Sequence, residues 1–172
     1  FVLYVGAISK RKNFLKLLEA MTLPENRDKH LVAVSNGGDE YGNAENYIYE
    51  NQLESNVFFL KDLPWYELPI IYHMSQGLVY PSLYEGFGLP ILEALRCGKP
   101  VITSNVSSMP EVGGDACIFI DPMNVEEISA AINFIYYNLE LAAEIKQKAL
   151  HQIEKFNPQK MTEKMMNIYR SL

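Results

Sequence analysis

The sequence predicts an α/β fold: a doubly wound parallel sheet in one Rossmann-like domain, followed by a helical C-terminal tail. Three observations predict it. Short apolar runs alternate with longer segments of helical spacing, the runs are apolar throughout, and the length of 172 residues suits one domain. Continuously apolar strands are typical of a parallel sheet that helices cover on both faces.

The elements can be assigned along the chain from these patterns. Buried strands are expected at residues 1–6, 30–36, 56–60, 77–82, 100–105 and 116–121. Helices are expected at residues 13–21, 41–53, 64–74, 90–97, 125–138, 139–156 and 158–172. Beyond Asp121 the pattern is helical throughout, and this stretch forms the tail.

The two ends of the chain suggest a missing partner domain. The last expected helix carries an apolar stripe at helical spacing: Met161, Met165, Ile168 and Leu172. The stripe packs either on this domain or on a missing one, and we favour the second. Residue 1 is Phe rather than Met and already belongs to a strand pattern. We therefore expect residues 1–172 to be one domain of an enzyme whose N-terminal domain is absent.

Composition and charge exclude several classes of protein. Acidic residues number 21 and basic residues 15, a net charge of −6, so no nucleic-acid partner is expected. No segment looks transmembrane and no signal peptide is visible. Cys97 and Cys117 lie among apolar residues without a histidine cluster. We expect buried free thiols, no metal site and a reducing, cytoplasmic location.

The most informative stretch is YPSLYEGFGLPILEALRCGKPVITSN, residues 80–105. A strand ends there, a loop with Gly86 and Gly88 follows, and a helix begins with a proline in its first turn. The glycines let the backbone approach a ligand closely. The free N–H groups of Gly88, Leu89 and Ile91 are expected to point from the helix start toward an anion such as phosphate. Open α/β sheets bind ligands at this edge.

Two carboxylates frame this loop. Glu85 precedes the glycines and is expected to be exposed in the cleft, whereas Glu93 lies about one turn into the helix. A carboxylate at position 93 is costly without a partner, and the adjacent hydroxyls of a ribose would supply two donors. Alternatively, Glu93 only accepts backbone N–H bonds and Glu85 is solvated. For the pair, the spacing around E-G-F-G favours a functional interpretation.

Three segments resemble a known family. E-G-F-G-L-P-I-L-E-A, residues 85–94, is similar to the signature of retaining glycosyltransferases of the GT-B fold, specifically the large family-four group. YVGAISKRKN, residues 4–13, resembles the first strand and phosphate loop of that family. PVITSNVSSMPEVGGDACIFIDP, residues 100–122, resembles the segment that follows the signature. The three segments occur in the family's order, which makes the resemblance specific.

The resemblance implies an activity and a set of site residues. Family members transfer a sugar from a nucleotide diphosphate-sugar with retention of the anomeric configuration, and their C-terminal domain binds most of the donor. By position, Glu93 would hold the ribose hydroxyls and Glu85 would contact the donor sugar. Lys12 matches the phosphate-binding lysine, and Gly6 belongs to the same loop. Backbone amides would lie against the sugar and the distal phosphate at Gly86, Phe87, Gly88 and Leu89.

One position departs from the family pattern. Many members carry Arg after the first-loop glycine, where this chain has Ala7, and Arg11 is expected to supply the second positive charge instead. Taken alone, Lys10, Arg11 and Lys12 could equally be a solvated cationic loop. Their place just past a strand end, opposite the E-G-F-G loop, favours a catalytic role for Arg11 and Lys12 in neutralising the diphosphate leaving group. Glu85 completes the catalytic set by positioning the sugar.

Several further residues are expected near the cleft: Tyr80, Pro81, Ser82, Tyr84, Ser107, Ser108 and Glu111. Tyr84 packs on the nucleotide or on its own loop, and the two serines form a loop over the donor or a plain turn before a helix. Residues 36–38 approach the base or ribose, or simply turn the chain. The histidines are expected to be structural or on the surface: His30, His73 and His151.

The functional prediction is the donor-binding domain of a retaining, mannosyltransferase-like enzyme of surface polysaccharide synthesis, inactive by itself. The expected substrate is a nucleotide diphosphate-sugar, with GDP-mannose suggested by the likeness of the first loop and of the Ser-Ser-x-Pro-Glu-Val run. No cofactor is expected. The expected partners are the donor and the missing N-terminal domain, through which the full-length protein would contact a membrane surface.

Two alternatives stay open. A flavodoxin-like nucleotide-binding or signalling module would need a phosphoacceptor aspartate at a strand end. The candidate aspartates do not cluster that way by strand position: Asp39, Asp62, Asp115 and Asp121. A sugar-nucleotide epimerase or a phosphorylase would keep the fold and change the chemistry, but the paired glutamates speak against it.

Overall fold

The computed structural model describes residues 1–138 and 140–171, apart from the side chains of residues 142, 143, 158 and 161. Six parallel strands form one sheet in the order β3-β2-β1-β4-β5-β6. The strands are β1 Val2–Val5, β2 Leu31–Val34, β3 Val57–Leu60, β4 Gly77–Tyr80, β5 Val101–Ser104 and β6 Ile118–Ile120. The predicted doubly wound, Rossmann-like class is confirmed.

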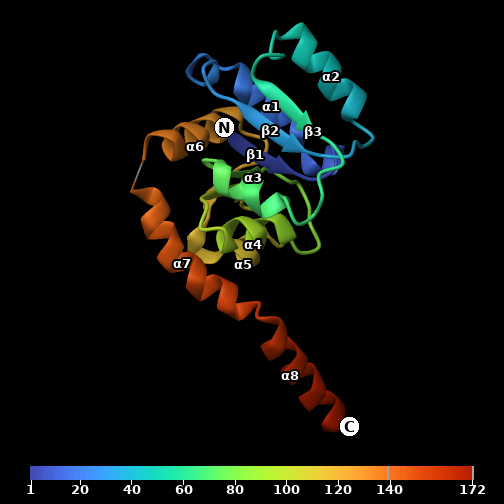
Figure 1. Cartoon of the computed structure of the whole chain (residues 1–172), viewed down its shortest axis with the longest axis vertical. Coiled ribbons are helices and arrows are strands. Elements are labelled where there is room, and N and C mark those ends of the chain that lie inside the picture. The colour runs from blue at the N-terminus through green and yellow to red at the C-terminus, as the bar shows by residue number, and fades with distance from the viewer. Residues whose placement is uncertain (139, 172) are drawn as a thin grey trace.

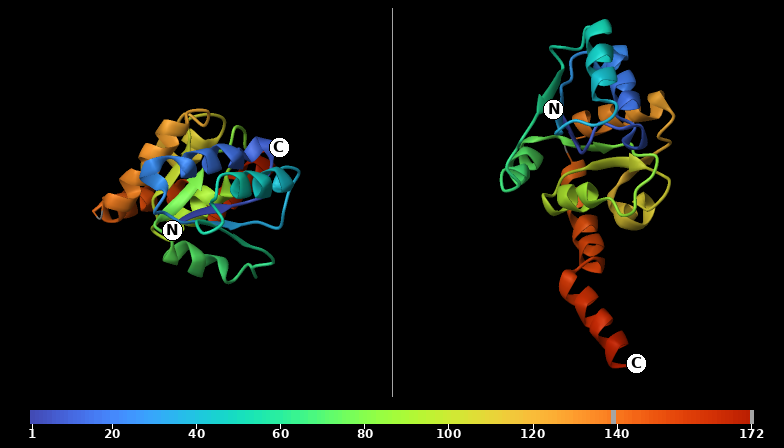
Figure 2. Two further views of the ribbon diagram at one scale, coloured as in Figure 1. Left: turned by 90° about the horizontal axis from the view of Figure 1, so that it is seen from above. Right: turned by 90° about the vertical axis from the view of Figure 1, so that its right-hand side faces the viewer.

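Helices cover both faces of this sheet (Figures 1 and 2). The helices that follow the strands are α1 Phe14–Thr22, α2 Tyr41–Glu50, α3 Leu68–Met74, α4 Leu89–Arg96, α5 Met109–Gly113 and α6 Val125–Tyr137. Three 3-10 turns join them: η1 Lys10–Lys12, η2 Pro24–Asn26 and η3 Gly114–Ala116. Helices α1, α2 and α6 pack together on one face, and α4 and α5 on the other.

The strand order reverses at β1, which pairs with β2 on one side and with β4 on the other. The chain leaves β1 toward α1 and leaves β4 toward α4, on opposite faces of the sheet. A crevice between the two outgoing loops is the usual ligand site of open parallel sheets. The fold therefore brings the first loop and the E-G-F-G loop to the same edge.

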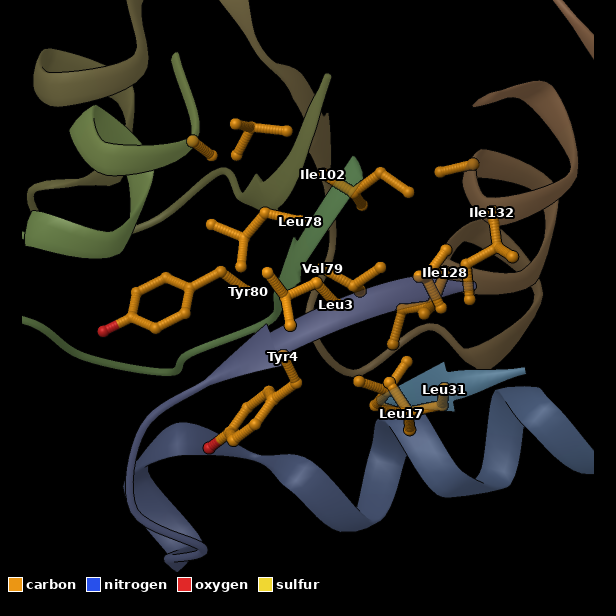
Figure 3. Close-up of a cluster of buried hydrophobic side chains, with 14 of the residues drawn as sticks. Leu3, Tyr4, Leu17, Leu31, Leu78, Val79, Tyr80, Ile102, Ile128 and Ile132 are labelled. Atoms are coloured by element: carbon orange, nitrogen blue, oxygen red, sulfur yellow. The ribbon is translucent and has the colours of Figure 1, made fainter. Parts of the chain in front are cut away.

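A cluster of buried side chains explains why the strands are apolar throughout (Figure 3). It joins the sheet to α1 and α6 through Leu3, Leu17, Leu31, Leu78, Val79, Ile102, Ile128 and Ile132. Burying one such side chain stabilises the fold by roughly 1.5–3 kcal/mol. Tyr4 and Tyr80 are also buried here, and their hydroxyl groups point away from the aliphatic side chains.

The predicted elements are confirmed in kind and order, with three local differences. Helix α5 was predicted only as one of two alternatives for its segment, and it forms because Met109 and Val112 are buried against the domain. The helix expected at 64–74 begins only at Leu68, since a turn in which Glu67 N–H donates to Pro64 O precedes it. The strand expected at 116–121 is shortened because η3 occupies its start.

The helical tail consists of α7 Leu141–Lys155 and α8 Pro158–Arg170. Helix α7 packs on α4 and η3, whereas α8 extends away from the domain (Figure 1). Met165 is 57% exposed and Ile168 is 62% exposed. The side chain of Met161 and residue Leu172 lie outside the described residues. The described part of the apolar stripe therefore does not pack on this domain.

No described helix combines the length and apolarity that crossing a bilayer requires. Cys97 and Cys117 are free thiols, but they are only partly buried, so the expectation of full burial is wrong. Burial nevertheless raises the pKa of the Cys117 thiol to about 12. This thiol is therefore protonated and unreactive at neutral pH.

Candidate donor site

The loops after β1 and β4 are tied to each other by their backbones. Leu83 N–H donates to Arg11 O at 2.8 Å. Asn13 adopts a left-handed conformation with φ 58°, and its buried amide nitrogen donates to Pro81 O at 3.1 Å and to Pro122 O at 2.7 Å. Asparagine suits this position because it tolerates positive φ and offers two side-chain donors. Asn13 thereby holds the cationic loop against the loop after β4.

Glu85 lies at the centre of the site. Its Oε2 is 2.7 Å from Arg11 NH1, and its Oε1 is 3.2 Å from Lys12 Nζ. The hydroxyls of Tyr80 and Ser82 donate to the same Oε1 at 2.7 and 3.1 Å. Only 11% of the Glu85 side chain is exposed. The expectation that Glu85 is exposed in the cleft is wrong, because two cations and two hydroxyls enclose it.

These contacts set the protonation state of the carboxyl. Burial by itself raises the pKa of Glu85, but hydrogen bonds from Tyr80 and Arg11 and the charge of Lys12 outweigh burial and bring the pKa below its ordinary value. Burial and the Glu85 carboxylate raise the pKa of the Tyr80 hydroxyl. Glu85 is therefore an anion at neutral pH, and Tyr80 keeps its proton.

The E-G-F-G loop ends at the start of α4. Gly88 is the N-cap with φ 105° and ψ 48°, a conformation that favours glycine. The first amides are not all free as expected, because Ile91 N–H donates to Gly88 O at 3.0 Å. The Phe87 ring faces away from the site and packs edge-on against Phe156 in the segment after α7, with centroids 5.3 Å apart. Only the backbone of Phe87 can serve a ligand here.

Two serines of the loop after β5 hold this loop in place. Ser107 Oγ donates to Glu85 O and accepts from Glu85 N–H, at 2.9 and 3.2 Å. Ser108 Oγ lies 2.9 Å from the carbonyl oxygens of both Glu85 and Phe87. Of the two alternatives for this segment, the structure shows the turn and helix start, since Ser108 is the N-cap of α5. The two serines also have a further role. They clamp the backbone that carries Glu85.

Glu93 has different surroundings. Its Oε2 accepts a hydrogen bond of 2.9 Å from the hydroxyl of the buried Tyr72 in α3. Glu93 also lines a cavity of about 190 Å³ between α3 and α4, together with Trp65, Leu68, Pro69, Tyr72, Arg96 and Cys97. Tyr72 thus fixes one oxygen of the carboxylate beside this cavity.

A larger cavity of about 430 Å³ lies where β1 and β2 end. Its lining includes Gly6, Asn36, Gly37 and Leu63. A Cβ on Gly6 would lie 2.9 Å from Lys12 Nζ, so the glycine lets the lysine fold back over the loop. A Cβ on Gly38 would lie 2.1 Å from Ile8 O, so Gly38 is required where the β2 loop crosses the β1 loop. Residues 36–38 thus turn the chain, and Asn36 and Gly37 also line the cavity.

The predicted site residues divide into two groups. Arg11, Lys12 and Glu85 are in direct contact, and Gly6 adjoins Lys12. Glu93 lies one turn along α4, with its own cavity. Residues outside the site are exposed on the surface: Asp39, Asp62, Asp115, Asp121, His30, His73 and His151. Across the described residues, no three His, Cys, Asp or Glu side chains gather as metal ligands.

Sequence reasoning missed three contacts of the site. It did not assign roles to Asn13 or Tyr72, and it placed Tyr80 only at the cleft edge. A signal existed for Asn13, since asparagine directly before an apolar helix is typical of a cap or a left-handed turn. No local signal exists for Tyr72 and Glu93, because α3 and α4 meet only in the folded chain.

A doubly wound sheet in which a cationic loop after β1 meets a glycine-containing loop after β4 is typical of ligand-binding Rossmann-like domains. A protein-family model described as "Glycosyl transferases group 1" matches residues 1–152. The chain belongs to this glycosyl transferase family, and its fold is that of the C-terminal domain of a GT-B glycosyltransferase. The flavodoxin-like alternative is not favoured.

Sequence relatives carry more specific names. The chain is 37% identical over 175 residues to the O-antigen chain mannosyltransferase B of Escherichia coli, covering 100% of this chain and 46% of that protein. It is 32% identical over 166 residues to the serotype-specific mannosyltransferase WbdA of Escherichia coli, covering 91% of this chain and 20% of that protein. The chain thus spans less than half the length of these relatives.

Solved structures share the fold over the whole chain. A sucrose-phosphate synthase from Thermosynechococcus elongatus superposes with a TM-score of 0.88 at 27% identity, covering 99% of this chain and 44% of that one. HepE of Anabaena, solved in complex with UDP and glucose, superposes with a TM-score of 0.87 at 22% identity, covering 100% of this chain and 48% of that one.

Proposed function

We propose that this chain is the donor-binding domain of a retaining glycosyltransferase that transfers a sugar from a nucleotide diphosphate-sugar to an acceptor. The observation that carries the proposal is the meeting of Arg11 and Lys12 with the E-G-F-G loop at the edge where β1 and β4 end. Family membership supports transfer. The mannosyltransferase names of the relatives support GDP-mannose as the donor and surface polysaccharide as the product.

The chemistry of the site assigns a role to each group. Arg11 and Lys12 balance the charge that grows on the diphosphate as the glycosidic bond breaks. Backbone amides from Gly86 to Leu89 face the sugar and the distal phosphate at the positive end of α4. Glu85 positions the sugar, and Glu93 accepts hydrogen bonds from the ribose hydroxyls. No resident cofactor enters this scheme, because the nucleotide-sugar is a substrate.

Retention requires that the acceptor attack from the face that the diphosphate leaves. In the proposed path an ion-pair-like transition state forms on that face, and the departing diphosphate takes the acceptor proton. Arg11 and Lys12 hold the diphosphate in place while this happens. Glu85 is not assigned as a nucleophile, since both of its oxygens are engaged by donors.

The acceptor is assigned to an N-terminal domain of the full-length protein. The exposed apolar side chains of α8, among them Met165 and Ile168, suit contact with such a domain. The same domain would bring a cytoplasmic enzyme to the membrane surface. Transfer therefore requires the full-length protein, whereas this chain alone binds the donor.

Calorimetric titration with GDP, UDP and ADP tests the proposal. We expect GDP to bind most tightly, and Lys12→Gln to weaken its binding about tenfold, as loss of a charged hydrogen bond does. Lys16→Gln is the matched control and should leave affinity unchanged, because among the described residues Lys16 pairs with Glu19 on α1, away from the site. Absence of binding by all three nucleotides at millimolar concentration contradicts the proposal. For the full-length enzyme, an inverted product in an NMR assay contradicts retention.

A further inference from the structure

Tyr80 forms hydrogen bonds with both a cation and a carboxylate of the site. It is the last residue of β4, and its side chain is buried. Its hydroxyl accepts a hydrogen bond of 2.7 Å from Lys12 Nζ and donates one of 2.7 Å to Glu85 Oε1. Lys12 Nζ also lies 4.7 Å from the centroid of the Tyr80 ring. A phenol can accept and donate at once, so Tyr80 couples the cation to the carboxylate.

In the free chain, Glu85 occupies the cations that a diphosphate needs. Oε2 is paired with Arg11 and Oε1 with Lys12. A diphosphate carries more negative charge than one carboxylate and therefore draws both side chains away from Glu85. The Arg11 side chain is 48% exposed and can follow, but its NH1 then also gives up the hydrogen bond of 2.6 Å that it donates to Tyr84 O. Binding thus removes the two charged partners of a largely enclosed carboxylate.

A carboxylate left without partners in such a place takes up a proton or turns toward water. Two neutral donors remain: Tyr80 on β4 and Ser82 just after it, both buried and both donating to Oε1. No other titratable side chain touches Glu85 among the described residues. Tyr4 on β1 lies near enough for Glu85 to raise the pKa of its hydroxyl, but that hydroxyl donates to Ala7 O.

We propose that Tyr80 is a positioning residue of the donor site, whose hydroxyl holds the Glu85 carboxylate in place and ionised when a diphosphate takes Arg11 and Lys12. This inference rests on the proposed donor-binding function. It explains why a tyrosine hydroxyl stands at the end of an otherwise apolar strand. The Ser82 hydroxyl also donates to Glu85 Oε1 and helps to hold the carboxylate, at the longer distance of 3.1 Å.

Tyr80→Phe tests the inference, because it removes the hydroxyl and keeps the buried ring. We expect affinity for GDP and for UDP to fall about three- to tenfold, the effect of one lost hydrogen bond. Calorimetry in two buffers of different ionisation enthalpy should also show proton uptake on binding that the wild type lacks, increasing from pH 7 to pH 5. Tyr136→Phe is the matched control, since this half-buried tyrosine contacts Lys29 away from the site.

Ser82→Ala is the second variant. It should show the same proton uptake to a smaller extent, and it carries the test if Tyr80→Phe loses its cooperative thermal transition. The inference is overturned if a folded variant binds both nucleotides as tightly as wild type and takes up no additional proton. Failure of wild type to bind either nucleotide contradicts the proposed function instead.

A measurement without ligand tests the role of Tyr80 separately from the proposed donor-binding function. The carboxyl carbon resonance of Glu85, identified by its loss in Glu85→Gln, can be followed by NMR during a pH titration. We expect the pKa of Glu85 to be higher in Tyr80→Phe than in wild type. An unchanged titration shows that the Tyr80 hydroxyl does not hold the carboxylate, whatever nucleotide binds.

Discussion

Glu85 and Glu93 belong to one short signature, yet their surroundings differ. Glu85 is enclosed by Arg11, Lys12 and two hydroxyls. In the described part of the chain, Glu93 has one side-chain donor, Tyr72, and it adjoins a cavity of about 190 Å³. The first carboxylate is saturated before any ligand arrives, and the second keeps acceptor capacity. A ligand must therefore exchange partners at Glu85, whereas it can simply add hydrogen bonds at Glu93.

The largest expected effect is a loss of turnover on substitution of Glu85. Glu85→Ala should reduce the turnover of the full-length enzyme at least about a hundredfold, as loss of a preorganised polar group at a reacting centre does. Its affinity for GDP should be no weaker than that of wild type, because Arg11 and Lys12 are released for the diphosphate. Steady-state kinetics and calorimetry measure the two quantities. A large loss of GDP affinity contradicts the distinction.

The next effect concerns nucleotide affinity. Glu93→Ala should weaken GDP binding by about 1.5–3 kcal/mol, roughly ten- to a hundredfold, because a charged acceptor of the ribose hydroxyls is lost. The matched comparison is the 2′,3′-dideoxy analogue of GDP, which should bind wild type and variant equally. Equal affinity of both proteins for GDP itself removes the ribose assignment.

Two glycines between these glutamates should respond differently. Gly88→Ala should lower the free energy of unfolding by about 1–3 kcal/mol, since alanine is strained at φ 105° and its Cβ would lie 3.1 Å from Ile91 Cδ1. Gly86→Ala should change it by less than about 1 kcal/mol, because no described atom beyond its two chain neighbours lies within 4 Å of the added Cβ. Urea denaturation measures both. Gly86→Ala should still weaken GDP binding if the loop backbone touches the donor.

The smallest effect is the pH dependence of stability. The pKa of Glu85 is lower in the folded chain than in the unfolded one, where it is about 4.3. Its stabilising contribution is therefore complete above the unfolded pKa and is lost as the pH falls through the folded pKa. Glu85→Gln should flatten the decline of unfolding free energy below about pH 5. An unchanged slope in urea denaturation shows that the contacts of Glu85 are equally present in the unfolded chain.

Much of the architecture could be predicted because it depends on local patterns. Apolar runs at 1–6 and 77–82 predicted β1 and β4, and the proline and glycines around residue 88 predicted the start of α4. The loop that carries Glu85 was found through its residue types alone. Helix α5 was predicted only as an alternative, since its five residues are too few to show a helical period.

The environment of each site residue could not be predicted in the same way. Glu85 was expected to be exposed, because sequence spacing does not show that Arg11 from the loop after β1 and Tyr80 at the end of β4 converge on it. The amide of Ile91 was expected to be free, but the tight first turn of α4 engages it. Contacts across neighbouring strands depend on strand order, which no local pattern contains.

By itself, the amino-acid sequence determined the class of fold, the glycine-containing loop before α4 and the family, because each follows from residues that are close together in the chain. Only the tertiary structure decided that Glu85 is paired in advance with Arg11 and Lys12, that Glu93 retains open space, and that α8 leaves the domain. The reason is physical: ion pairing, burial and packing depend on which segments the sheet brings together.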